Sequence, residues 1–140
     1  MKLLVPIDAS DHAKRALQYA AQLAKATGGS VHLLNVAEDY GEVDRVHAYH
    51  REEGLLAPVR EKGAALIRDA EATLTAAGVP VTSEMLVGSV ARTIAARARE
   101  LGCDAIVMGT HGLGFLDNML MGSTSRKVLA LTDLPLTLVK

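Results

Sequence analysis

Short apolar runs recur along this chain, and each is followed by a longer stretch with helical spacing of its apolar residues. A run of four to eight apolar or alternating residues between turn signals is typical of a strand. Strands are therefore expected at residues 2–7, 30–36, 79–87, 104–109 and 135–140.

Helices are expected between these strands, because apolar residues recur there on one face at a period of 3.6. The first lies between the cap residues Ser10 or Asp11 and the stop at Gly28, with Ala13, Ala16, Leu17, Ala20, Leu23 and Ala24 on its apolar face. The second is expected from Ala57 to Ala77, with Pro58 in its first turn and an apolar face made of Val59, Leu66, Ile67, Ala70 and Leu74. The third is expected between Ser89 and Gly102, and the fourth from Ser123 to Leu131.

The stretch from Ala37 to about Leu56 is polar and irregular, and it is too long for a plain connector. We expect a mobile flap there. The remaining alternation of strands and helices predicts βαβ units and a parallel sheet in a single domain, residues 1–140.

Prolines help to order the strands, because a central strand resists a residue without an N–H group. Pro80 and Pro135 mark the third and fifth strands as edges, whereas Pro6 is expected where the first strand finishes. Two edges and right-handed crossovers fit the order 3-2-1-4-5. The predicted fold is a three-layer, doubly wound α/β sandwich with a crevice at the ends of strands 1 and 4.

Composition narrows the classes of partner. Hydrophobic residues form 49% of the 140 residues, the formal net charge is −1, and acidic and basic residues are mixed along the chain. Such a chain has no extended basic field for nucleic acid. No apolar run approaches the roughly 18 residues of a membrane span, and the first residues lack a secretory signal pattern. We therefore expect a cytoplasmic protein with no nucleic-acid or membrane partner.

The candidate chemistry lies after the fourth expected strand, where Gly109 and Gly112 precede Gly122 and a run of hydroxyl residues that begins a helix. Glycines let the backbone approach a ligand closely, and a helix N-terminus attracts anions. The motif is not a Walker loop, since the chain has no Gly-Lys pair, and the first strand is not followed by the dinucleotide fingerprint. A phosphate site of another type is indicated.

The spacing of Gly109, Gly112, Gly122 and Ser123 matches the G-x2-G-x9-G-[ST] signature of the universal stress protein family. The opening from Leu4 to Ser10 and the ending from Asp133 to Lys140 resemble that family too, so the resemblance spans the whole chain. It implies the five-stranded fold described above, and it places the chain in the nucleotide-binding branch of the family.

The resemblance also implies a set of ligand-binding residues. Asp8 would bond the ribose or base edge, backbone at Val36 would contact adenine, and the phosphates would meet backbone N–H and hydroxyl groups. The implied set is Pro6, Asp8, Val36, Met108, Gly109, Gly112, Gly122, Ser123, Thr124 and Ser125. The residues alone leave Asp8 and Ser123 open as simple helix caps.

The implied ligand is ATP, with ADP and AMP as alternatives, and Mg²⁺ is expected to accompany it. Many binders in the family carry a basic residue directly after the second glycine, where this chain has Leu113. Arg126, Lys127 or the Mg²⁺ would have to supply the missing positive charge.

Three functions are compatible with these features. The first is a regulatory module of the stress response that is not an enzyme and whose ATP occupancy changes the surface offered to an unidentified protein partner. The second is a slow ATPase or phosphotransfer enzyme, for which Asp8 is the one candidate base. The third is an interaction protein without nucleotide. The exposed fifth strand further predicts a homodimer that buries Leu136 and Leu138.

The other potentially reactive residues give weaker indications of a functional site. His47, His50 and Glu53 share a helical spacing, but no third histidine or cysteine is near, so we expect no metal site. Phosphate contact is one alternative for His111, but we expect an exposed loop residue without a ligand; Cys103 is expected to be a small buried residue.

Overall fold

The computed structural model describes residues 1–38, 52–112 and 120–140. Its strands form one five-stranded parallel sheet in the order β3-β2-β1-β4-β5, which confirms the predicted fold and topology. The strands are β1 (Lys2–Pro6), β2 (Ser30–Glu38), β3 (Val81–Gly88), β4 (Ala105–Gly109) and β5 (Leu136–Val139).

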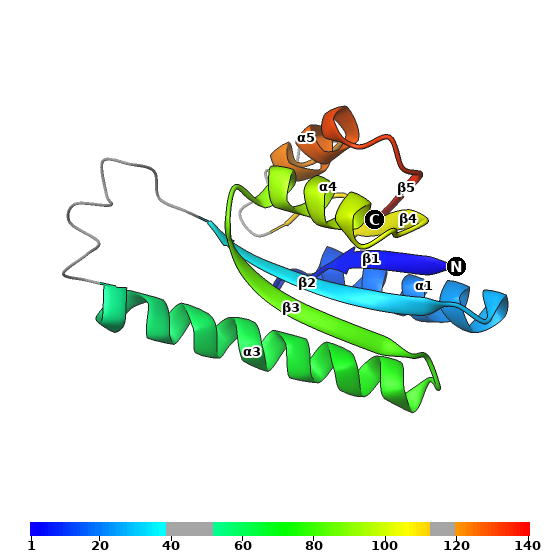
Figure 1. Cartoon of the computed structure of the whole chain (residues 1–140), viewed down its shortest axis with the longest axis horizontal. Helices are drawn as coiled ribbons and strands as arrows, with labels where there is room; N and C mark the ends of the chain where they lie inside the picture. Colours follow the sequence, from blue (N-terminus) through cyan, green and yellow to red (C-terminus); the bar gives the residue numbers. More distant parts are fainter. Residues whose placement is uncertain (39–51, 113–119) are drawn as a thin grey trace.

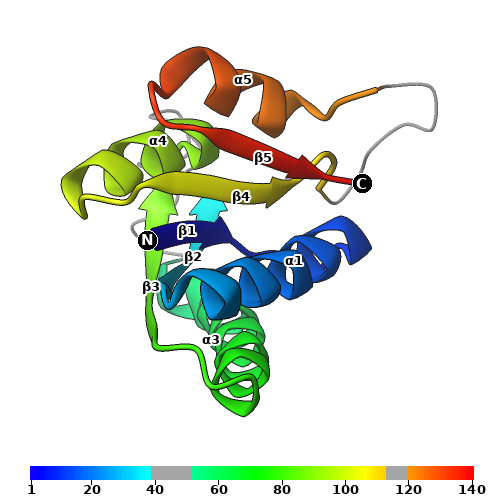
Figure 2. The ribbon, with the colours of Figure 1, turned by 90° about the vertical axis from the view of Figure 1, so that its right-hand side faces the viewer.

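Helices cover both faces of this sheet, as Figures 1 and 2 show. They are α1 (Asp11–Thr27), α3 (Glu52–Ala76), α4 (Val90–Glu100) and α5 (Ser123–Leu131). Helices α1 and α3 lie on one face, and α4 and α5 lie on the other (Figure 2). The direction of winding therefore reverses between β1 and β4, where parallel α/β sheets form their crevice.

Each face of the sheet has its own apolar core. The first contains Leu3 and Val5 of β1 and Leu74 of α3, all fully buried, together with the alanine face of α1. The second contains Leu4 of β1 and Ile94 of α4. Neighbouring residues of β1 thus point into opposite cores, as the period of two in a strand requires.

The caps of α1 match the prediction. The hydroxyl of Ser10 accepts a 3.1 Å hydrogen bond from the N–H of Ala13, and Gly28 ends the helix with a φ of 63°. A left-handed residue at this position favours glycine. Ser89 precedes α4 as predicted, without a side-chain cap.

The second predicted helix begins earlier than expected, at Glu52, so that Pro58 lies inside α3 rather than in its first turn. Proline costs about 3 kcal/mol in a helix interior, and good helix formers around it offset that cost here. Val59 is also 45% exposed, not inward, because the start of α3 extends beyond the sheet (Figure 1). Of the predicted flap, residues 37–38 belong to β2, 52–56 belong to α3, and the rest lies outside the described residues.

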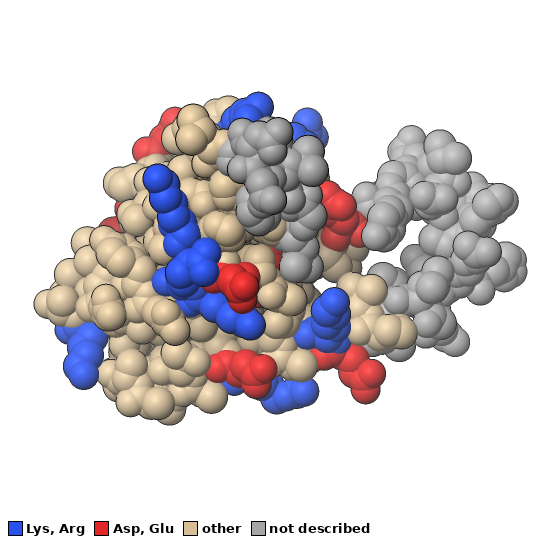
Figure 3. Space-filling view, turned by 180° about the vertical axis from the view of Figure 1, so that it is seen from behind, with Lys and Arg blue, Asp and Glu red and all other residues tan. Residues whose placement is uncertain are grey.

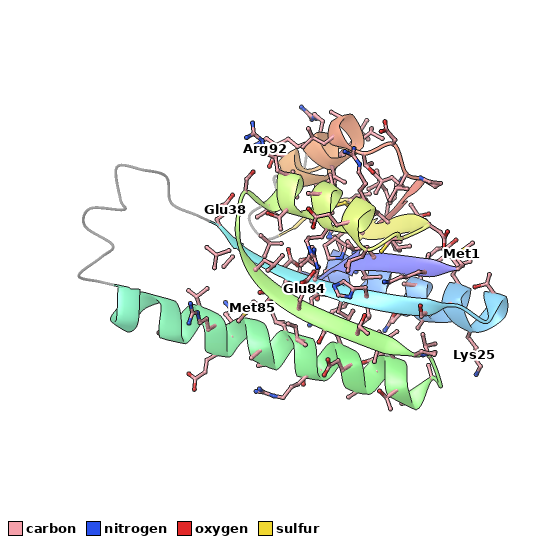
Figure 4. All side chains as sticks on the ribbon, viewed as in Figure 1. Met1, Lys25, Glu38, Glu84, Met85 and Arg92 are labelled. Atoms are coloured by element: carbon pink, nitrogen blue, oxygen red, sulfur yellow. The ribbon has the colours of Figure 1, made fainter. Side chains whose placement is uncertain are left out.

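Gly63 explains how closely α3 approaches the sheet. A Cβ atom there would overlap the sulfur of Met85 on β3 and the amide oxygen of Asn35 on β2. Figure 4 shows the Met85 side chain on the α3 side of the sheet. A glycine inside a helix is destabilising by about 1 kcal/mol relative to alanine, and this contact accounts for it.

Charged side chains of both signs are interspersed on the surface seen in Figure 3. Among the described residues, no helix has the length and apolar character needed to span a membrane.

Candidate functional site

The carboxyl ends of β1 and β4 lie side by side, because Leu4 pairs with Ile106 in parallel register. Two residues further along these strands are Pro6 and Met108, both members of the predicted site. Pro6 is half-buried and Met108 is 6% exposed in the second core. The half-buried Val36 packs against the same core. The strand register therefore places Pro6 and Met108 at the adjoining ends of β1 and β4, with Val36 near the end of β2.

Hydrogen bonds fix the turn that carries Asp8. The N–H of Ile7 donates to the Leu34 carbonyl over 2.9 Å, and the Asn35 side-chain amide donates to the Ile7 carbonyl over 3.0 Å. The Oδ1 atom of Asp8 then accepts the N–H of Ser10 over 2.8 Å. One carboxylate oxygen thus closes the turn before α1, whereas the helix cap itself is Ser10 and not Asp8.

The other oxygen of Asp8 faces the glycine loop. A Cβ atom on Gly112 would lie 2.9 Å from Asp8 Oδ2, closer than such contacts normally come. The structure therefore brings together two parts of the predicted site that are more than a hundred residues apart in the chain. Glycine at 112 therefore lets the loop approach the Asp8 carboxylate closely, and a Cβ would fill this cradle between the loop and the carboxylate.

Gly109 and Gly122 are packed against protein atoms instead. A Cβ on Gly109 would lie 2.7 Å from the Cβ of His12 in α1. Gly122 donates its N–H to the Thr110 carbonyl over 2.7 Å, and a Cβ on it would lie 3.1 Å from that oxygen. These two glycines hold β4, its loop and the start of α5 close together.

The hydroxyl residues at the start of α5 differ in exposure. Ser123 is exposed, Thr124 is half-buried and Ser125 is 2% exposed. Because the N-cap residue is Gly122, no side chain caps the first turn. Its N–H groups can therefore bond an anion at the positive end of the helix dipole.

Ser125 belongs to the framework of the site. Its hydroxyl lies 3.0 Å from the Gly109 carbonyl and 2.9 Å from the Thr110 carbonyl, and it donates to them. A serine has one O–H proton, so that proton is used inside the protein. We assign Ser125 to holding α5 against β4 rather than to direct phosphate contact.

Two buried polar residues of the loop were missed by the sequence prediction. Thr110 is 6% exposed and His111 is 8% exposed, so the expectation of an exposed His111 was wrong. The Oγ1 atom of Thr110 and Nδ1 of His111 are 3.0 Å apart, and the His111 ring lies 5.1 Å from the ring of His12. The burial comes from the packing of α1 against the end of β4, which the local sequence does not reveal.

A second polar cluster lies between β2, β3 and α4, away from the glycine loop. Arg97 donates to both oxygens of Glu84, over 2.7 and 3.1 Å, and His32 Nε2 lies 3.1 Å from Glu84 Oε1. Figure 4 shows Glu84 between the sheet and α4. The hydrogen bonds from Arg97 are the main cause that lowers the pKa of Glu84 below 4.5. We interpret this cluster as a structural clamp.

Cys103 matches the prediction of a small buried residue. Cys103 is buried, and that burial raises the pKa of its thiol. The described residues contain no group of three or more His, Cys, Asp or Glu side chains placed to hold a metal. The side chains of His47, His50 and Glu53 lie outside the described part.

Solved structures share this fold. The hypothetical protein MJ0577 superposes with a TM-score of 0.88 at 27% identity, covering 99% of this chain and 94% of that one. A universal stress protein in complex with cAMP has a TM-score of 0.75 at 22% identity, covering 100% and 97%. An Archaeoglobus fulgidus universal stress protein in complex with dAMP has a TM-score of 0.72 at 24% identity, covering 100% and 98%.

Sequence comparison leads to the same group. A Thermus aquaticus protein, the universal stress protein in the QAH/OAS sulfhydrylase 3'region, is 36% identical over 143 residues, covering 99% of this chain and 97% of the relative. The family model described as "Universal stress protein family" matches residues 1–140. The chain therefore belongs to the universal stress protein family.

Proposed function

We propose that this protein is a cytoplasmic, ATP-binding regulatory module of the stress response. The adenosine lies in the crevice at the ends of β1 and β4, and the phosphates meet the loop from Gly109 to Gly112 and the first turn of α5. Occupancy of this site changes the surface that the protein offers to a partner.

One observation carries the proposal: Asp8 and Gly112 meet across the crevice, 2.9 Å from carboxylate oxygen to the position of a Cβ. A side chain larger than hydrogen there would press against the carboxylate, so glycine is what lets the loop and Asp8 approach each other. The uncapped start of α5 lies beside the same loop, since Gly122 bonds the Thr110 carbonyl. An acceptor for a ribose hydroxyl and donors for phosphate therefore lie at one crevice.

Family members that bind adenine nucleotides support the choice of ligand. Two structural neighbours were solved with cAMP and dAMP, each under 25% identical to this chain. Both ligands contain adenine and one phosphate. ATP is the proposed ligand because the first turn of α5, which has no side-chain cap, offers backbone N–H groups to further phosphates. Mg²⁺ would neutralise part of the phosphate charge.

We propose a binding module rather than an enzyme. Phosphoryl transfer needs a base or water-positioning group and firm metal ligation at the terminal phosphate. Among the described residues, Asp8 is the carboxylate that faces Gly112, and one of its oxygens already accepts the N–H of Ser10. Its chemistry suits ligand recognition better than catalysis.

The module is further proposed to act as a homodimer joined through β5. This strand is at the edge of the sheet and is paired on one side by β4. Leu136 and Leu138 are only half-buried. A second copy would cover this edge and complete the burial of both leucines.

The proposal is tested by releasing whatever the purified protein carries. The protein is denatured, the small molecules are separated by chromatography, and binding of Mg-ATP, ADP, AMP and Mg-GTP is then measured by calorimetry and thermal shift. ATP in the released fraction and selective stabilisation by Mg-ATP support the module. ADP together with measured turnover supports the slow enzyme, whereas no nucleotide and no thermal shift contradict both.

A matched variant separates the site from the fold. Asp8→Asn keeps an oxygen that can accept the N–H of Ser10, so it should unfold at nearly the wild-type temperature while losing about tenfold or more in ATP affinity. Asp11→Asn, at an exposed position of the first turn of α1, is the control and should bind ATP as the wild type does.

A further inference from the structure

Two histidines from different parts of the chain lie together under the glycine loop. His12 is in the first turn of α1, and His111 stands between Gly109 and Gly112. Their ring centroids are 5.1 Å apart and the planes are tilted by 59°. His111 is buried at 8% exposure, and His12 is half-buried. The pair is therefore held in place by the packing of α1 against the end of β4.

The Cβ of His12 and the backbone of His111 lie next to glycines on the two sides of the proposed phosphate site. A Cβ on Gly109 would lie 2.7 Å from the Cβ of His12, and a Cβ on Gly122 would lie 3.3 Å from the Cα of His111. Gly109 precedes the loop, and Gly122 begins α5. An anion bound between the loop and the start of α5 would therefore lie within the range of about 10 Å over which charges interact at moderate ionic strength.

The charges that face the pair are mixed. The pKa of His12 is lowered below 6.5, first by burial and then by Arg15 and His111, while Asp11 and Asp8 act in the opposite direction. Burial therefore favours the neutral form of the His12 imidazole, and a nearby anion would act in the opposite direction.

We propose that phosphate binding at the glycine loop draws one proton onto the His12–His111 pair, so that the imidazolium supplies positive charge that the loop lacks. This inference rests on the proposed function. The sequence places Leu113 after the second glycine, so the loop has no basic side chain of its own at that position. A neighbouring anion favours the charged form of an imidazole. Rings 5.1 Å apart repel when both are charged, so the pair takes up one proton and not two.

Proton uptake makes the pair a determinant of specificity. By linkage, a ligand whose binding takes up a proton binds more tightly as the pH falls. The affinity for ATP should therefore rise by about threefold to tenfold from pH 8 to pH 6. Adenosine carries no phosphate, so its affinity should not change over this range. The site thus selects for phosphate charge through a proton rather than through a lysine or arginine.

Calorimetry in two buffers of different ionisation enthalpy measures the proton count directly. At pH 7, ATP binding to the wild type should take up about half a proton more than binding to the His12→Asn, His111→Asn double variant. Titration of the nucleotide itself is common to both proteins and cancels in the difference. Asparagine at 111 keeps a group that can bond Thr110 in place of Nδ1. Adenosine with the wild type is the matched control and should take up no proton.

A second measurement needs no variant. In NMR titrations of the wild-type imidazole protons, saturating ATP should raise the pKa of one histidine by about one unit, and adenosine should leave it in place. Equal proton uptake by both proteins, or histidine titrations that ATP does not change, would overturn the inference while leaving the nucleotide site intact. If the wild type fails to bind ATP at all, the proposed function itself is wrong.

Discussion

The hydroxyl of Ser125 lies 3.0 Å from the carbonyl oxygen of Gly109, and this contact joins the first turn of α5 to the last residue of β4. It separates two roles among neighbouring hydroxyls. Ser123 is exposed at the helix start, where a ligand can reach it, whereas Ser125 is used to hold the helix in position.

Replacing Ser125 with alanine should therefore weaken the fold and the site together. The Gly109 carbonyl would lose the hydroxyl donor, while the Thr110 carbonyl would keep the Gly122 N–H, at a cost of about 1–3 kcal/mol in the free energy of unfolding. Urea unfolding checks the stability. Ser123→Ala is the control, with unfolding within about 0.5 kcal/mol of the wild type and weaker ATP binding by calorimetry. The assignment fails if the two variants are equally stable.

Alanine substitutions at Gly109 and Gly112 should likewise separate an effect on stability from an effect on ATP binding. Gly109→Ala would force a Cβ against His12 and should destabilise the fold by about 1–3 kcal/mol. Gly112→Ala would meet Asp8 Oδ2, a movable side-chain atom, so it should fold well and lose ATP affinity. Thermal unfolding and calorimetry on both variants provide the comparison. Wild-type affinity in Gly112→Ala would exclude the proposed cradle.

The clamp at Glu84 should make stability depend on pH. Because Arg97 lowers the pKa of Glu84, the folded protein binds fewer protons there than the unfolded chain does. The clamp therefore stabilises the fold above the ordinary carboxyl pKa of 4.5, and this contribution is lost as the pH falls through the lowered value. Urea unfolding from pH 7 to pH 3 should show a large difference between wild type and Arg97→Gln at pH 7 that shrinks in acid.

Glu100→Gln is the control for this prediction. Glu100 also accepts from Arg97, over 2.6 Å, but its side chain is 58% exposed, so its ion pair is worth little. The free energy of unfolding of Glu100→Gln should therefore depend on pH as that of the wild type does. A gap between Arg97→Gln and wild type that stays constant from pH 7 to pH 3 would show that Glu84 does not titrate as described.

Leu138→Glu should convert the proposed homodimer into a monomer, because a charge at the edge strand prevents burial against a second copy. Light scattering coupled to size exclusion checks the mass. Leu138 also packs against the second core, so thermal unfolding must show that the variant is folded. Leu129→Glu is the control, since Leu129 is 53% exposed on α5. A folded Leu138→Glu that remains dimeric would exclude this interface.

The order of the strands and the place of the glycine loop were predictable from the sequence, since both depend on local signals. The prolines at 80 and 135 identified the edge strands, and the alternation of strands and helices predicted the parallel sheet. The helix α5 begins and ends at the predicted residues, Ser123 and Leu131. The spacing of the glycines was enough to predict the family.

The predictions for Pro58 and His111 were wrong because each relied on a local sequence signal that the packing of the folded chain overrides. Pro58 predicted a helix start and lies inside α3, because the residues around it sustain the helix. His111 was expected in solvent and is buried, because α1 packs against the loop that carries it.

The sequence by itself determined the sheet order, the family and the residue types at the candidate site, because short-range patterns and spacing encode them. Only the tertiary structure decided what each residue contacts. Asp8 faces Gly112, Ser125 bonds Gly109, and His12 meets His111 because distant segments pack together. Burial and contact depend on that packing, and no local pattern of the chain records it.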